Sequence, residues 1–328
     1  MTEPLILVVG YANQPQTAHQ INMLLARGAR VVNLDPYGRN GEYAPLVWSD
    51  DYITWADYPI PANHVQGVIL SANAPEFPTE EAFYKHPHGS INWEEWYQQF
   101  GLQRDRSDTL LGLLLHLEQH GVKMLNAPSK SIISRRKAFQ IQAMRRAGCT
   151  LPATLITNDA KAARAFINNY PECIAKPAAG GSLTVSANHL LEQGILERLH
   201  AAPAIFQERI IGKDVRVTIV NGEIVSSVII NVPEGLLDFR NAPGYQEGLT
   251  QYVEQPLPEA VAEQCRNAVK ALGLTFSGID LRLTSEGKYV MLECNSSPIY
   301  LDVEYKTKHS ITKKICDYFL AIPASEIG

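Results

Sequence analysis

Short apolar runs alternate with amphipathic helical patterns in the first part of the chain. Each run is bounded by glycine or polar residues, as buried strands usually are, and each helical pattern ends at a glycine. Because strands that alternate with helices usually form a parallel sheet covered on both faces, the predicted class is α/β. The predicted strands lie at 5–9, 29–34, 66–71 and 122–126, and the predicted helices at 17–27 and 107–120.

The pattern changes twice further along the chain. Pro128 interrupts it, and strands dominate from Ala204 onward, where Asn221-Gly222 indicates the turn of an antiparallel hairpin. We therefore predict three domains, with an α+β arrangement in the last, and their bounds are 1–126, 127–204 and 205–328. Further strands are predicted at 155–157, 173–177, 205–211, 215–220, 224–232, 276–283 and 289–293, and further helices at 131–147, 159–168, 258–272 and 310–320.

Composition narrows the classes of protein to which the chain can belong. A net charge of −5 and a pI near 6.0 argue against a general nucleic-acid-binding protein, which would usually be basic. No stretch is apolar for long enough to cross a bilayer, and the run at 5–9 predicts a strand rather than a signal peptide. The five cysteines form no CxxC motif, which favours free thiols in a reducing cytoplasm over disulfides or a zinc site.

Several familiar catalytic motifs are absent from the sequence. The first strand ends in a single glycine rather than in GxGxxG, and Gly212-Lys213-Asp214 is not a Walker loop. No GxSxG elbow and no HExxH motif occurs either. These absences argue against a dinucleotide-binding, Walker-loop, serine-hydrolase or HExxH zinc site.

One candidate arrangement lies on the predicted strands at 276–283 and 289–293, which a short turn joins. Antiparallel pairing of these strands brings Asp280 near Glu293, and Asn295 lies two residues further along the same face. Oxygen ligands of this kind suit Mg²⁺ bound together with nucleotide phosphates. The alternative is a pair of carboxylates that face solvent, but the apolar flanks predict buried strands, in which an unpaired carboxylate is costly.

The two segments that carry these side chains resemble the signature of the ATP-grasp superfamily. They read FSGIDLR at 276–282 and MLECNSSP at 291–298, and the earlier part of the chain matches the family in the same order. The resemblance extends from about residue 127 to the C-terminus, and the N-terminal α/β part fits the domain that usually precedes it. The earlier segments are Lys137, KPAAGGS at 176–182, FQERI at 206–210, Asp214-Val215-Arg216 and DFRN at 238–241.

The resemblance implies a fold that holds ATP between the central and C-terminal domains, and it implies roles for particular residues. Two lysines supply positive charge to the phosphates of ATP, and small residues after Lys176 let backbone N–H groups approach them. The implied catalytic residues are Arg240 and Arg216. The implied nucleotide-binding residues are Lys137, Lys176, Gly180, Gly181, Ser182, Gln207, Glu208, Arg209, Ile210, Asp214 and Asn241. The implied metal ligands are Asp280, Glu293 and Asn295, for Mg²⁺ or Mn²⁺.

The implied activity is a ligase reaction in which ATP converts a carboxylate into an acyl phosphate, and an amine or hydroxyl then displaces phosphate. Two branches of the superfamily compete. The spacing around Asp238-Phe239-Arg240 favours ligases that crosslink a precursor peptide, and Asn295-Ser296-Ser297-Pro298 favours ligases that add glutamate. Ile299 stands where the family pattern leads us to expect glycine, which leaves the shape of the acceptor pocket open.

The alternative from another class is an ATP-grasp kinase or a nucleotide-binding protein without catalysis. We expect the substrates to be a carboxylate and an acceptor, with a precursor peptide as the favoured source. No nucleic-acid or membrane partner is expected. The expected location is the cytoplasm, and a homodimer is the default assembly.

Overall fold

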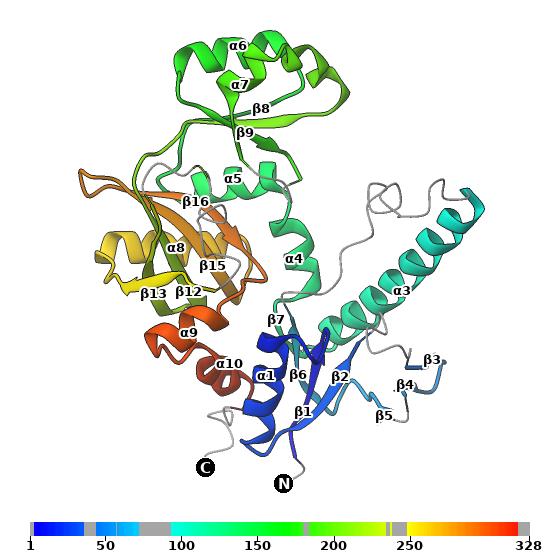
Figure 1. The fold of residues 1–328 in the computed structure, drawn as a ribbon. Helices are drawn as coiled ribbons and strands as arrows, with labels where there is room; N and C mark the ends of the chain where they lie inside the picture. Colours follow the sequence, from blue (N-terminus) through cyan, green and yellow to red (C-terminus); the bar gives the residue numbers. More distant parts are fainter. Residues whose placement is uncertain are drawn as a thin grey trace. The chain divides into compact units, whose positions relative to one another are not determined.

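The computed structural model describes residues 3–35, 44–56, 58–71, 93–179, 184–233, 237 and 248–320 (Figure 1). The chain forms two compact units. The first comprises Met1–Ser129 together with Thr312–Gly328, and the second comprises Lys130–Ile311. Among the described residues, no helix has both the length and the apolar character that a membrane span needs.

The first unit is built on a parallel four-stranded sheet in the order β2-β1-β6-β7. All residues of β1 are buried, as expected for a strand with helices over both faces of its sheet. A small antiparallel sheet, β3-β4-β5, completes the unit. The elements are β1 (Leu5–Val9), α1 (Pro15–Leu25), β2 (Arg30–Leu34), β3 (Leu46–Trp48), β4 (Ile53–Trp55), β5 (Tyr58–Pro59), β6 (Val65–Leu70), α3 (Trp93–Gln119), β7 (Lys123–Leu125) and α10 (Ile311–Leu320). Helix α4 (Pro128–Ser134) begins in this unit and continues into the second from Lys130.

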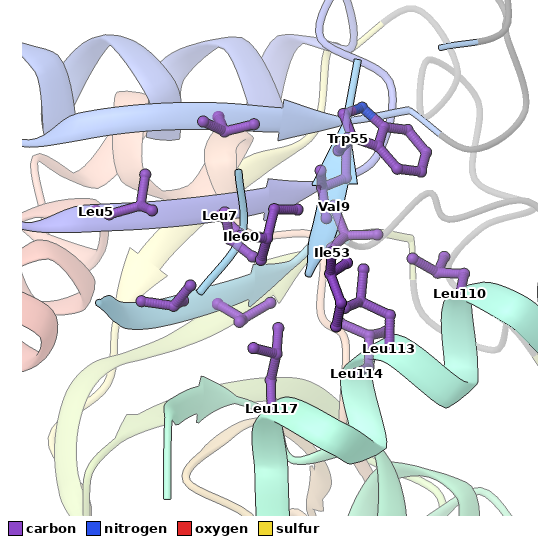
Figure 2. Close-up of a cluster of buried hydrophobic side chains, with 14 of the residues drawn as sticks. Leu5, Leu7, Val9, Ile53, Trp55, Ile60, Leu110, Leu113, Leu114 and Leu117 are labelled. Carbon is purple, nitrogen blue, oxygen red and sulfur yellow. The ribbon is translucent and has the colours of Figure 1, made fainter. Parts of the chain in front are cut away.

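One face of the parallel sheet forms the core of this unit. Leu5, Leu7 and Val9 alternate along β1 and point to the same side, where the leucines of α3 cover them (Figure 2). Ile53 and Trp55 of β4 extend the same cluster, so the small sheet is attached through apolar packing. The leucines of α3 in this cluster are Leu110, Leu113, Leu114 and Leu117.

The second unit contains two antiparallel sheets. The first, in the order β10-β9-β11-β8, packs against α6, α7 and a 3₁₀ helix, η1, through a core that includes Ile167, Leu196 and Phe206. Its elements are β8 (Thr154–Thr157), α6 (Ala160–Asn169), β9 (Ile174–Pro177), β10 (Val185–Ser186), α7 (Ala187–Glu192), η1 (Ile195–Ala201) and β11 (Ala204–Gln207).

The second sheet has five strands in the order β14-β13-β12-β15-β16, all antiparallel. Helix α8 and the end of α5 cover one face, where Met144, Cys265 and Val269 meet the apolar residues of the strands. The opposite face carries charged side chains, among them those of Arg216 and Asp280. The elements are α5 (Lys137–Arg146), β12 (Lys213–Val220), β13 (Glu223–Asn231), β14 (Gln251–Glu254), α8 (Glu259–Ala271), β15 (Phe276–Leu283), β16 (Tyr289–Asn295) and α9 (Leu301–Thr307).

Most predicted elements are present, with two differences in the helices. The helix predicted at 107–120 begins much earlier, at Trp93, and the helix predicted at 131–147 is two helices. The break lies at Arg135 and Arg136, where Arg136 is extended and precedes a new helix. Neither glycine nor proline marks this break, so the residue pattern did not reveal it. The bounds of the three predicted domains stay predictions.

The hairpin and the thiols agree with the sequence. Asn221 and Gly222 both have positive φ, 49° and 79°, which the two-residue turn between β12 and β13 requires. All five cysteines are free and buried, as the absence of a CxxC motif indicated.

The close approach of α10 to β6 gives a test of the first unit. A Cβ on Gly67 would lie 2.1 Å from Cδ1 of Phe319, a side chain that is itself fully buried. We expect Gly67→Ala to lower the free energy of unfolding by about 1–3 kcal/mol because the ring has no room to move. Thermal denaturation followed by circular dichroism measures the change.

Gly101→Ala is the matched control. Gly101 lies within α3, and an added Cβ would meet nothing within 4 Å. This substitution should leave stability unchanged or raise it by about 0.5–1 kcal/mol, since alanine is the better helix former. An equal loss of stability in both variants would contradict the packing argument.

Candidate active site

Two carboxylates face each other across the last two strands of the five-stranded sheet. Asp280 on β15 is directly opposite Glu293 on β16. The side-chain amide of Asn295 lies between them and donates from Nδ2 to Oδ2 of Asp280, at 3.2 Å, and to Oε1 of Glu293, at 3.0 Å. The structure therefore brings together the three side chains that the sequence predicted as metal ligands.

A β-bulge in β16 makes this arrangement possible. Asp280 pairs with Glu293, but the next residue, Leu281, pairs with Met291, so that Leu292 is the extra residue. In a regular strand, Met291 would point to the same face as Glu293. The bulge instead turns Met291 into the apolar core, while Glu293 stays on the polar face.

Each of the two carboxylates forms an ion pair with a different positively charged side chain. The guanidinium of Arg216, directly opposite Asp280 on β12, donates from Nε to Oδ1 of Asp280 at 2.5 Å. The ammonium of Lys137, on the first residue of α5, lies 2.7 Å from Oε2 of Glu293. The side chains of Asp280 and Glu293 are 17% and 28% exposed, so both ion pairs are shielded from water without being closed off.

The two carboxyl groups differ in acidity. Burial raises the pKa of Asp280 above its ordinary value, against the charge of Arg216, and the negative charge of Glu293 adds to the rise. Burial opposes ionisation of Glu293 too, but Lys137, with a contribution from Lys176, outweighs it and lowers the pKa of Glu293. Glu293 therefore favours its ionised form. An added positive charge nearby would favour the ionised form of Asp280, whose pKa is raised.

A second ion pair continues the same face of the sheet. Asp214 on β12 is directly opposite Arg282 on β15, and Oδ1 of Asp214 lies 3.1 Å from Nε of Arg282. Arg282 also donates to the backbone carbonyls of Gly212, at 2.9 Å, and Leu237, at 3.4 Å. The resemblance implied that Asp214 binds the nucleotide, which stays a prediction; in the structure its carboxylate lies against Arg282.

Arg282 was missed as a site residue, although its signal was present in the sequence. The pair Asp214 and Arg216 and the pair Asp280 and Arg282 both follow an acid-x-arginine pattern on paired strands. Antiparallel pairing sets each acid opposite an arginine, so the four charges alternate across the two strands.

The predicted nucleotide-binding residues of the central sheet lie on β9, on β11 and directly after it. Lys176 donates from Nζ to Oε1 of Gln207 at 3.2 Å, and Gln207 donates in turn to Oγ1 of Thr154 at 3.0 Å. The carboxylate of Glu208 accepts from the backbone N–H of Ala153 at 3.1 Å. Arg209 and Ile210 follow in the chain, and Arg209 lies 3.7 Å from a carboxylate oxygen of Glu172.

Other predicted residues lie outside the part of the chain that the structure describes. These are Gly180, Gly181, Ser182, Arg240 and Asn241. Within the described ranges, no group of three or more His, Cys, Asp or Glu side chains is placed to hold a metal ion. The candidate site therefore rests on two carboxylates and one amide.

The chain belongs to the RimK-like ATP-grasp family, whose domain model matches residues 134–319. Among curated proteins, it is 25% identical to N-acetylaspartylglutamate synthase A of Homo sapiens over 230 residues, which cover 66% of this chain and 57% of that protein. It is 26% identical to a probable alpha-L-glutamate ligase of Pasteurella multocida over 275 residues, 75% of this chain and 85% of that protein. The chain thus spans less than two thirds of the length of the first of these relatives.

Solved structures match over almost the whole chain. The ATP-grasp ligase PsnB complexed with a minimal precursor has 29% identity and a TM-score of 0.80, over 98% of this chain and 99% of that one. The macrocyclase MdnC of Microcystis aeruginosa, bound with precursor peptide MdnA, has 20% identity and a TM-score of 0.74, over 96% and 99%. The second likeness shows the fold alone, and both place this chain in the ATP-grasp fold.

The buried ion pair between Asp214 and Arg282 yields a prediction about stability. Both side chains are largely buried, at 10% and 13% exposure, so removing the guanidinium takes away a positive charge that faces the buried carboxylate of Asp214. We expect Arg282→Met to lower the free energy of unfolding by about 3–5 kcal/mol. Urea denaturation measures the loss.

Two further variants separate charge from packing. The double variant Asp214→Asn/Arg282→Met should recover part of the loss, because no buried charge is left over. Arg266→Met removes an exposed ion pair with Glu259 and should cost less than about 1 kcal/mol. A loss in Arg282→Met no larger than in Arg266→Met would show that the buried pair is unimportant for stability.

Proposed function

We propose that this protein is an ATP-dependent ligase that activates a carboxylate as an acyl phosphate and joins it to an amine or a hydroxyl. The observation that carries the proposal is the cluster of Asp280, Glu293 and Asn295, held by Arg216 and Lys137 in a chain of the RimK-like ATP-grasp family. A cluster of oxygen donors with positively charged side chains beside it suits the binding of a nucleotide triphosphate with its metal ion.

The donor set fits Mg²⁺. Asp280 and Glu293 supply carboxylate oxygens, and Asn295 supplies an amide oxygen once its side chain turns, because its nitrogen now faces both carboxylates. Three protein ligands leave positions for phosphate oxygens and water, as Mg²⁺ sites with nucleotides usually do. When bound, the ion neutralises charge on the phosphates. A solved PsnB structure contains Mg and ADP, at 26% identity to this chain, and Mn²⁺ as a substitute stays a prediction.

The cations of the chain have distinct tasks in the proposed reaction. Lys137 and Lys176 bind phosphate oxygens, and Arg216 holds Asp280 in the orientation that the metal site needs. The substrate carboxylate oxygen attacks the γ-phosphorus, and the bond from that phosphorus to the β-phosphate oxygen breaks, which yields acyl phosphate and ADP. The acceptor then attacks the acyl carbon, loses its proton and displaces inorganic phosphate. Arg240 is assigned to the developing charge by resemblance alone.

We propose a peptide as the substrate. The support is the likeness to PsnB, which holds over 98% of the chain and whose solved structures contain a precursor peptide. The alternative is the addition of glutamate to a small molecule or a protein, supported by the likeness to a probable alpha-L-glutamate ligase. An ATP-grasp kinase is the alternative of another class. Location in the cytoplasm and a homodimer stay predictions from the sequence.

Removing the charge of Glu293 tests the metal site. We expect Glu293→Gln to lower Mg²⁺-dependent ATP turnover by about 100-fold or more, since several kcal/mol of charge stabilisation depend on the bound ion. The matched control is Glu286→Gln, which changes an exposed carboxylate in the turn between the same two strands and should retain full turnover. Release of ADP measures both, and full activity of Glu293→Gln would remove Glu293 from the site.

Trapping with hydroxylamine tests the acyl phosphate. Free amino acids, dipeptides and acidic peptides are screened for ADP release, and each active compound is then incubated with ATP, Mg²⁺ and hydroxylamine. We expect a hydroxamate, because hydroxylamine displaces phosphate from an acyl phosphate. ADP release without any hydroxamate would support a kinase instead.

The mass of the product without hydroxylamine distinguishes the two ligase branches. A crosslink within one peptide removes the mass of one water molecule, whereas addition of an amino acid raises the mass of the product. We expect the loss of water at a peptide that carries an acidic residue. A product of increased mass would support the glutamate-ligase alternative.

A further inference from the structure

Gln140 on α5 is a buried polar residue whose side-chain amide makes three hydrogen bonds. Its side chain is 1% exposed. The amide nitrogen donates to the carbonyl oxygens of Cys294, at 2.7 Å, and Ser134, at 2.8 Å, and the amide oxygen accepts from the backbone N–H of Cys294 at 3.2 Å. Both donor hydrogens and the acceptor are therefore used.

The contact with Cys294 takes the place of a neighbouring strand. Among the described residues, β16 is the last strand of its sheet, so the outer edge of its backbone has no partner strand there. Gln140 bonds both backbone groups of Cys294, as an adjacent strand would, and the carbonyl of Thr150 accepts from the N–H of Met291 at 2.8 Å. These bonds fix the free edge at two places along β16.

The position of this contact links it to the metal ligands. Cys294 lies between Glu293 and Asn295, so a bond to its backbone sets the direction of both neighbouring side chains. Lys137 is three residues before Gln140 and on the same face of α5, where its ammonium holds Glu293 at 2.7 Å. One face of one helix therefore holds the carboxylate and the backbone beside it.

We infer that Gln140 is a positioning residue that holds Glu293 and Asn295 in the geometry needed to bind a divalent cation together with a nucleotide. This inference rests on the proposed function. The side chain of Gln140 bonds the backbone of Cys294 and not the side chains of Glu293 or Asn295, so it acts through that backbone. The carbonyl of Ser134, near the end of α4, joins the break between α4 and α5 to the same amide group, so the start of α5 is tied to β16.

Gln140→Met tests the inference, because methionine has a similar length and volume but makes none of the three bonds. The measurement is calorimetric binding of ADP at increasing MgCl₂, compared with binding of ADP without metal. We expect the Mg²⁺ concentration for half-maximal ADP binding to rise by about 10–100-fold, the usual effect of removing a residue that orients metal ligands. The metal-free affinity should change by less. Hydrogen exchange should show faster exchange of the Cys294 amide.

Ile141→Ala is the matched control, since Ile141 is buried on the same helix and makes no such bond to β16. This variant should lower the thermal midpoint but leave the Mg²⁺ requirement unchanged. If Gln140→Met does not fold, Gln140→Asn replaces it, because its shorter amide cannot reach both backbone atoms of Cys294. An unchanged Mg²⁺ requirement in the Gln140 variant, or an equal rise in Ile141→Ala, overturns the inference alone. Wild-type protein that binds no ADP with Mg²⁺ overturns the proposed function as well.

Discussion

The arrangement of the site depends on the repulsion between two carboxylates on adjacent strands. Asp280 and Glu293 carry like charges directly opposite each other, which destabilises a sheet unless other groups compensate. Arg216 compensates from one side and Lys137 from the other. The amide of Asn295 joins the two carboxylates at the centre. A bound cation would reduce the same repulsion more strongly, and this favours cation binding between the two carboxylates.

Much of this arrangement follows from the residue pattern. The strand predicted at 276–283 has these bounds in the structure, and the alternation of polar and apolar residues sets Asp280 on one face with Ile279 and Leu281 on the other. The turn between the strands fixes their order. The sequence therefore places Asp280 and Glu293 on neighbouring strands, but counting back from the turn sets Leu292, not Glu293, opposite Asp280.

Other features could not be predicted because they depend on backbone irregularities and on packing between distant segments. The bulge at Leu292 leaves no mark in the sequence, yet it decides that Met291 packs in the core and Glu293 does not. The break after α4 has no proline or glycine, yet it sets the first residue of α5 at Lys137. In the sequence, Gln140 does not differ from other polar residues of an amphipathic helix. Its bond to Cys294 depends on the packing of β16 beside α5. The predicted residues Arg240 and Asn241 and the loop at 180–182 lie outside the described part of the chain.

The alternating charges on β12 and β15 have a physical cost that the apolar face of the same strands avoids. Desolvation of Asp214, Arg216, Asp280 and Arg282 costs free energy, and ion pairs recover this only in part. Apolar residues at these positions would be compatible with the sheet, since the opposite face is apolar throughout its core. What the charged face gains is orientation, because each side chain is held by a partner on the neighbouring strand before any ligand arrives. Groups fixed in advance need little reorganisation when a phosphate binds, and this is the property that catalysis of phosphoryl transfer demands.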